Sequence, residues 1–215
     1  MSGSCGRSRS VSLDAGGEGD DGRSRREALS RGIAGVAAVA GVVLFGRHAR
    51  QAGAAPSRAQ DQKIFNFALL LEYLQAAFYS EAVDHGRLKG EVREFAEIVS
   101  EHERDHVRYL QKALGSKARE RPTFTFGDAT QDQRKFLDAA VLLENTGVAA
   151  YNGQAANLTK KALAAAAEIV SVEGRHAAWI SDLAGQEPAP RAADPGATAG
   201  EVIATLRKTG FVRKT

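Results

Sequence analysis

The chain has 215 residues, of which 43% are hydrophobic and 26% charged, and its formal net charge at pH 7 is +3. The whole positive excess lies in residues 1–54, which hold eight Arg and five acidic residues, so the remaining 21 basic and 21 acidic residues balance. This balance argues against a nucleic-acid partner. Cys5 is the only cysteine, so beyond residue 54 metal ligands must be oxygen and nitrogen atoms.

The first 54 residues have the pattern of an export signal. A polar leader is followed by Arg25 and Arg26, a mildly apolar run at 32–46 and a small-residue site, which is typical of a twin-arginine signal read by the Tat translocase. We therefore expect cleavage before Ala55 and export across the cytoplasmic membrane, to the periplasm, the cell wall or the medium. The alternative is an uncleaved N-terminal membrane anchor, although 15 apolar residues fall short of the roughly 20 that span a bilayer.

After residue 55 the hydrophobic residues recur at helical spacing in four segments, at about 58–84, 89–114, 130–156 and 159–184. Ser57 and Thr130 are expected N-caps, since each has Gln three residues later, as in a capping box. Gly147 and Gly153 weaken the third helix by roughly 1 kcal/mol each, which close approach of another helix would explain. Short connections within each pair and a longer one between the pairs predict an all-α fold, an antiparallel four-helix bundle of two helical hairpins.

Two further segments are expected to pack on this bundle. The strand-like stretch 122–127 is interpreted as part of the crossover loop between the hairpins, with Phe124 and Phe126 buried. A Pro-rich strap follows the last helix and leads into a short amphipathic helix at 201–208. The expected organisation is a signal segment at 1–54, a bundle at 55–185 and a tail at 186–215.

The second helix carries Glu103 and His106 on its apolar seam. Both belong to the hydrophobic series that recur every seven residues, so they point into the core together. The fourth helix repeats the pattern 70 residues later with Glu173 and His176. Glu-x-x-His on two helices of a bundle is the pattern of carboxylate-bridged dimetal proteins.

The first and third helices each carry one acid where an apolar residue belongs, Glu72 and Glu144. Buried carboxylates are costly unless they are paired or bound to metal, and two divalent cations would neutralise four of them. Carboxylate with imidazole suits iron, manganese or zinc better than calcium or magnesium. We therefore expect two metal ions, iron first and manganese next, with six candidate ligands: Glu72, Glu103, His106, Glu144, Glu173 and His176. Tyr79 and Tyr151, on the faces of Glu72 and Glu144, are either hydrogen-bond donors to these ligands or plain core residues.

A zinc protease is the minor alternative, because residues 102–106 read H-E-x-x-H. That enzyme would need His102 as a ligand beside His106. His102 precedes Glu103 directly and so lies roughly 100° round the helix from it. We expect it only to border the seam.

Four stretches of the sequence resemble those of a known superfamily. They are L-L-L-E-Y-L-Q-A-A-F-Y around Glu72, S-E-H-E-R-D-H around Glu103, L-L-E-N-T-G-V-A-A-Y-N-G around Glu144 and V-E-G-R-H-A-A-W-I around Glu173. Over about 58–185 the chain resembles the ferritin-like dimetal-carboxylate superfamily, and most closely exported ferritin-like proteins similar to desiccation-related proteins. The resemblance implies that Glu72 and Glu144 are terminal ligands of one metal each, Glu103 and Glu173 bridges, and His106 and His176 the nitrogen ligands.

The activity is left open by this resemblance, because the superfamily includes ferroxidases, peroxidases, manganese catalases, oxygenases and stress proteins. We expect a dimetal oxidoreductase or an iron-handling stress protein whose metal ions meet dioxygen or peroxide. The alternative is a metal-binding or structural stress protein without turnover. Whether the chain forms a homo-oligomer is also open.

Overall fold

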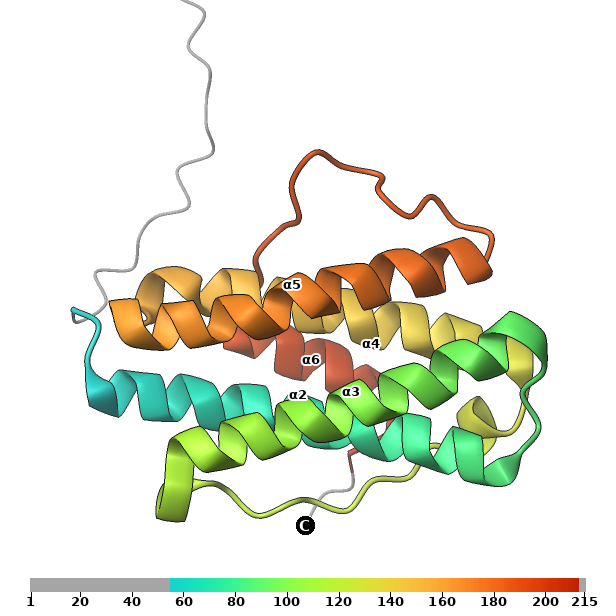
Figure 1. Ribbon diagram of the computed structural model, residues 1–215, viewed down its shortest axis with the longest axis horizontal. Coiled ribbons are helices and arrows are strands. Elements are labelled where there is room, and N and C mark those ends of the chain that lie inside the picture. The colour runs from blue at the N-terminus through green and yellow to red at the C-terminus, as the bar shows by residue number, and fades with distance from the viewer. Residues whose placement is uncertain (1–54, 213–215) are drawn as a thin grey trace, which may run out of the picture. The chain divides into compact units, whose positions relative to one another are not determined.

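The computed structural model describes residues 55–212, and in this range the chain is helical. Helices α2 (Arg58–His85) and α3 (Gly90–Leu114) form one antiparallel hairpin, and α4 (Gln133–Gln154) and α5 (Lys160–Leu183) form another, with α6 (Ala199–Thr209) following (Figure 1). Short 3-10 turns lie at Gly115–Lys117, Gly127–Thr130 and Ala155–Asn157. The expected all-α bundle is confirmed. The expected signal segment, residues 1–54, lies outside the described residues.

No helix within residues 55–212 has the length and apolar character needed to cross a membrane.

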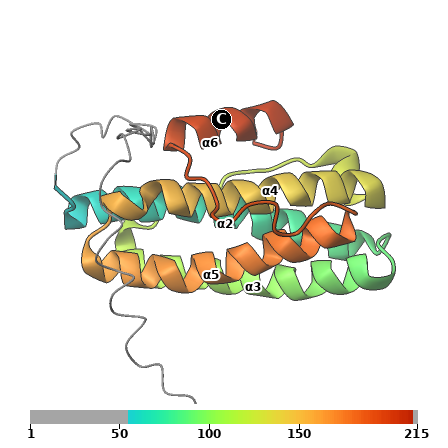
Figure 2. The same ribbon diagram turned by 90° about the horizontal axis from the view of Figure 1, so that it is seen from above.

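The four long helices form two layers, one of α2 with α4 and one of α3 with α5 (Figure 2). Helix α6 lies on the outer side of the first layer, where Val202 and Leu206 are buried against the core. The tail helix α6 therefore packs on the bundle. Apolar residues of the bundle form two clusters, one around Phe78 and Phe95 and one around Phe65. Along each long helix the candidate metal ligands lie between these two clusters.

The helix ends follow local capping chemistry. Ser57 accepts a hydrogen bond from the backbone N–H of Gln60, as expected for the N-cap of α2. The expectation that Thr130 caps α4 is wrong, because α4 begins after Asp132, whose carboxylate accepts from the backbone N–H of Lys135 at 2.9 Å. Thr130 instead lies buried in the preceding 3-10 turn. An ionised Asp is as good a cap as Thr and lies two residues nearer the helix.

Two other expectations, the burial of Phe124 and the close neighbour of Gly153, are wrong. Phe126 is buried, whereas Phe124 is only half-buried and pairs through its backbone with Val212 in an isolated bridge. A Cβ atom on Gly153 would lie 1.9 Å from the carbonyl oxygen of Ala197. The close neighbour of Gly153 is therefore the C-terminal strap and not another helix.

Candidate metal centre

Four acidic side chains, one from each long helix, meet in the middle of the bundle. Glu72 comes from α2, Glu103 from α3, Glu144 from α4 and Glu173 from α5, and each is at most 1% exposed. They are buried because each takes a position on the apolar face of its helix, between the two hydrophobic clusters. Carboxylates are almost never buried this deeply without a partner, so these four acids are expected to have partners that compensate their charge.

Two buried histidines complete the cluster and divide it into two overlapping groups, in each of which one ligand atom per residue lies within 4.8 Å of the others. The first group is Glu72, Glu103, His106 and Glu173, and the second is Glu103, Glu144, Glu173 and His176. Glu103 and Glu173 belong to both, and these are the two residues that the resemblance assigns as bridges. The structure thus brings all six candidate ligands together.

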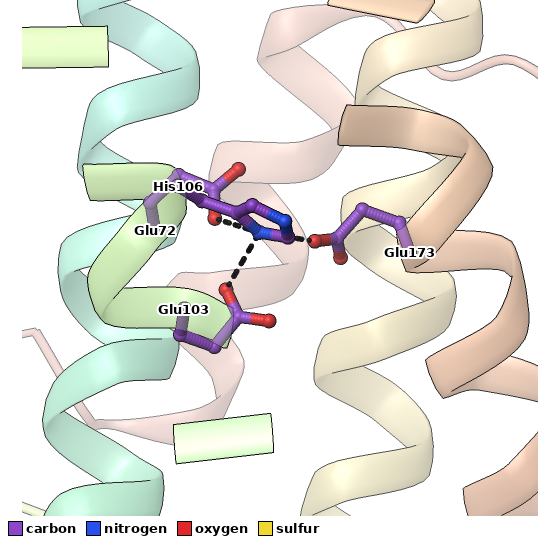
Figure 3. Close-up of side chains that lie close together, drawn as sticks. All are labelled: Glu72, Glu103, His106 and Glu173. Atoms are coloured by element: carbon purple, nitrogen blue, oxygen red, sulfur yellow. Dashed lines mark ion pairs between the residues drawn. The ribbon is translucent and has the colours of Figure 1, made fainter. Parts of the chain in front are cut away.

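Each histidine turns Nδ1 toward the carboxylates. Nδ1 of His106 lies 3.0 Å from Oε1 of Glu173, 3.3 Å from Oε2 of Glu72 and 3.5 Å from Oε2 of Glu103 (Figure 3). Nδ1 of His176 lies 3.2 Å from Oε1 of Glu103 and 3.4 Å from Oε2 of Glu144. The two halves of the cluster therefore have the same composition, one imidazole nitrogen among carboxylate oxygens.

Two tyrosines fix the orientation of two of the acids, each on the neighbouring helix of the same layer. The Tyr79 hydroxyl on α2 donates to Oε1 of Glu144 on α4, and the Tyr151 hydroxyl on α4 donates to Oε1 of Glu72 on α2, both at 2.5 Å. Gln75 adds a second donor to Oε1 of Glu144, at 3.0 Å. Burial and the negative charge of the acceptor carboxylate raise the pKa of both tyrosines well above 10.0, so both hydroxyls remain donors.

The remaining ligand atoms have no hydrogen-bond partner among the described residues. They are eight buried atoms: Oε2 of Glu72, both oxygens of Glu103, Nδ1 of His106, Oε2 of Glu144, both oxygens of Glu173 and Nδ1 of His176. A buried polar atom without a partner costs about 1–3 kcal/mol. All eight belong to the two groups, and as carboxylate oxygens and imidazole nitrogens they are the donors that a divalent transition metal binds. The residues present therefore fit a pair of metal ions.

The protonation of the metal-free cluster also reflects crowding of negative charge. Burial and the charge of Glu72 raise the pKa of Glu103 well above 4.5, and burial and the charge of Glu103 do the same for Glu173. Burial alone would raise the pKa of Glu72, but His106 beside it lowers it. Burial alone would lower the pKa of His106, but the three carboxylates around it raise it well above 6.5. Cations entering the cluster would take the place of these protons.

His102 lies outside both groups, although it is part of the H-E-x-x-H stretch. Its Nδ1 lies 2.9 Å from Nε2 of His176, on the side of that ring away from the carboxylates. Together they line a cleft between α3 and α5, with His106 and Trp179 also on its wall. The structure does not join His102 to Glu103 and His106 in one metal-binding group, which removes the basis of the zinc-protease alternative.

Three contributors to the site were missed at the level of sequence. Gln75 lies three residues after Glu72, one helical turn along the same face, so the spacing could have revealed it. His102 was expected only to border the seam, because it lies roughly 100° round the helix from Glu103. Gly147 was expected to allow close helix approach, but what its missing side chain makes room for is the carboxylate of Glu173.

Comparison with known proteins agrees with this architecture. No curated protein matches the chain. Residues 60–186, which include all but the first two residues of the four long helices and all six clustered residues, match the family model described as the ferritin-like domain. The chain therefore belongs to the ferritin-like domain family.

Proposed function

We propose that this chain is an exported ferritin-like protein that binds two iron ions in the cluster and uses them in oxidation, peroxide removal or iron handling under stress. The proposal rests on eight buried carboxylate oxygens and imidazole nitrogens that could ligate a metal. They have no hydrogen-bond partner among residues 55–212, and all of them are directed at one another. Such an arrangement is unfavourable by itself and becomes favourable when cations occupy it.

The charge of the cluster supports two divalent ions. Four ionised carboxylates carry four negative charges, which two divalent cations balance. Calcium and magnesium prefer oxygen ligands alone, whereas each half of this cluster offers a nitrogen. Zinc fits the donor set but has no redox chemistry. Iron, with manganese next, is therefore the metal that combines this donor set with oxidation chemistry.

Two redox-active ions bound there would supply the two electrons that reduce dioxygen to peroxide or peroxide to water. The side chains of the protein would hold the ions, and neighbouring residues orient the carboxylate ligands. Tyr79 and Tyr151 engage one oxygen each of Glu144 and Glu72, which leaves the other oxygen of each acid directed at the cluster. The carboxylates are shielded from water, and His106, on the wall of the α3–α5 cleft, is the most exposed of the six residues at 8%. Small molecules would therefore approach from this cleft.

Metal loading followed by oxidation tests the proposal. Protein purified from its own host, and metal-free protein titrated with Fe(II), should each hold two metal ions per chain. Dioxygen or peroxide added to the Fe(II)-loaded protein should then oxidise the iron rapidly, as followed by absorbance. The variant E103A with E173A should lose both ions, whereas E101A, an exposed neighbour on α3, should lose none. Binding without oxidation would favour a metal-binding stress protein without turnover, and absence of binding would overturn the proposal.

Export is a separate part of the proposal and rests on the sequence before residue 55. A site assembled from four helices exists only after folding, and the twin-arginine route carries folded proteins, so metal would be selected in the cytoplasm. We expect the variant R25K with R26K to accumulate in the cytoplasm, folded and metal-loaded. Cell fractionation with metal analysis of each pool measures this. Normal export of the variant would rule out twin-arginine dependence, and a folded but metal-free cytoplasmic pool would rule out loading before export.

A further inference from the structure

The two halves of the cluster differ at the outer nitrogens of their histidines. Nε2 of His176 lies 2.9 Å from Nδ1 of His102, and the ring planes differ by only 14°. This separation is shorter than the roughly 3.5 Å contact of stacked rings, so the rings meet edge to edge and the hydrogen bond lies near both ring planes. His106 has no such partner: in the described part of the chain no hydrogen bond reaches its Nε2.

The hydrogen bond determines where the protons lie when a cation is present. Nδ1 of His176 can give its lone pair to a cation only if the ring proton is on Nε2. That proton then points at Nδ1 of His102, which accepts it and therefore carries its own proton on Nε2. His102 thus favours the one tautomer of His176 in which Nδ1 is a ligand, and it restrains rotation of the ring.

We propose that His102 is a positioning residue for His176, and that it makes the Glu144/His176 half of the centre the tighter of the two cation sites. This rests on the proposed function, since it presupposes that the cluster binds two metal ions. The H-E-x-x-H stretch then has a role different from that in zinc proteases. Its first histidine serves a ligand on another helix, α5, and its second is itself a ligand.

Single-ion variants separate the two halves. H106A removes the nitrogen of the Glu72/His106 half, and H176A removes that of the other half. Each of these two variants is then combined with H102L or with H102N. Leucine cannot accept the hydrogen bond from Nε2 of His176, whereas the amide oxygen of asparagine can. His102 is exposed, so neither replacement disturbs the core. K112L, an exposed position further along α3, is the matched control for the change to Leu. The readouts are Co(II) affinity by chelator competition, the Co(II) absorption spectrum and the melting temperature of the metal-free protein.

In the H106A background we expect H102L to weaken Co(II) binding about 10–100-fold, with a changed spectrum, recovery in H102N and no effect of K112L. In the H176A background H102L should change nothing, since its partner is absent. Equal loss in both backgrounds, or a lower melting temperature of metal-free H102L, would show a general structural effect and overturn the proposal. Unchanged affinity in H106A would overturn it too. If the unaltered protein binds no metal at all, it is the proposed function that fails.

Discussion

A Cβ atom on Gly147 would lie 3.0 Å from Oε2 of Glu173, so the absence of a side chain at residue 147 leaves room for this carboxylate. Replacing a helical Gly by Ala normally stabilises a protein by about 1 kcal/mol. In G147A the methyl group must displace the carboxylate by a few tenths of an ångström. We expect metal affinity to fall about tenfold or more, while the melting temperature of the metal-free protein stays the same or rises.

Gly174 provides the matched control, because it directly follows Glu173 on α5 and a Cβ atom there would meet nothing within 4 Å. G174A should raise the stability of the metal-free protein by about 1 kcal/mol and leave metal affinity unchanged. Isothermal titration of both variants with the same divalent metal measures metal affinity, and thermal unfolding measures the stability of the metal-free protein. Equal metal affinity of G147A and G174A would show that the space beside Glu173 has no importance for binding.

The tyrosine hydrogen bonds predict unequal effects for two similar substitutions. Among the described residues Tyr151 is the single hydrogen-bond donor to Oε1 of Glu72, whereas Oε1 of Glu144 keeps the donor Gln75 when the Tyr79 hydroxyl is lost. Leaving a buried acceptor without a partner costs about 1–3 kcal/mol. We therefore expect Y151F to lower the stability of the metal-loaded protein, and its metal affinity, more than Y79F does.

Tyr73 serves as the control for these two variants, because its hydroxyl bonds with Gln111 and the carbonyl oxygen of Arg119, away from the cluster. Y73F should lower stability without changing metal affinity. Denaturant unfolding and metal titration of the three variants test this order. A larger effect of Y79F than of Y151F would contradict the account of how Glu144 is held.

The periodicity of the sequence was sufficient to predict the bundle and the faces of its helices. The helical repeat determines which side chains point inward, and short loops make neighbouring helices antiparallel, so Glu103 and Glu173 could be placed in one core from spacing alone. The contact of His102 with His176 could not be predicted in this way. It depends on the distance and rotation between α3 and α5, which side-chain packing sets. The strap against Gly153 is a similar case, since no local pattern fixes where a Pro-rich segment lies.

Metal removal should lower the stability of the fold, because it leaves four acids at core positions. We expect chelation to lower the melting temperature by several degrees, since removing a ligand that binds only the folded state removes its stabilisation. At a pH above the raised pKa values of Glu103 and Glu173, the variant E103Q with E173Q carries two fewer negative charges and should melt above the metal-free unaltered protein. Its melting temperature should also be insensitive to chelator. Differential scanning calorimetry with and without chelator tests both statements, and equal melting of the loaded and metal-free forms would refute the first.

The stabilisation by metal should grow as the pH rises. In the metal-free fold the pKa values of Glu103, Glu173 and His106 are raised, so the stability that their protons contribute is complete below the unfolded pKa values and is lost as pH rises through the folded ones. The pKa of Glu72 is lowered, so this one group has the opposite effect on stability, but the three groups with raised pKa values determine the direction of the change. Metal binding needs these groups deprotonated, so protons compete with metal at low pH. Melting temperatures measured from about pH 5.5 to about pH 8.5, with and without chelator, should therefore diverge. A difference that narrows with rising pH would show that burial and mutual repulsion do not control the protonation of these acids.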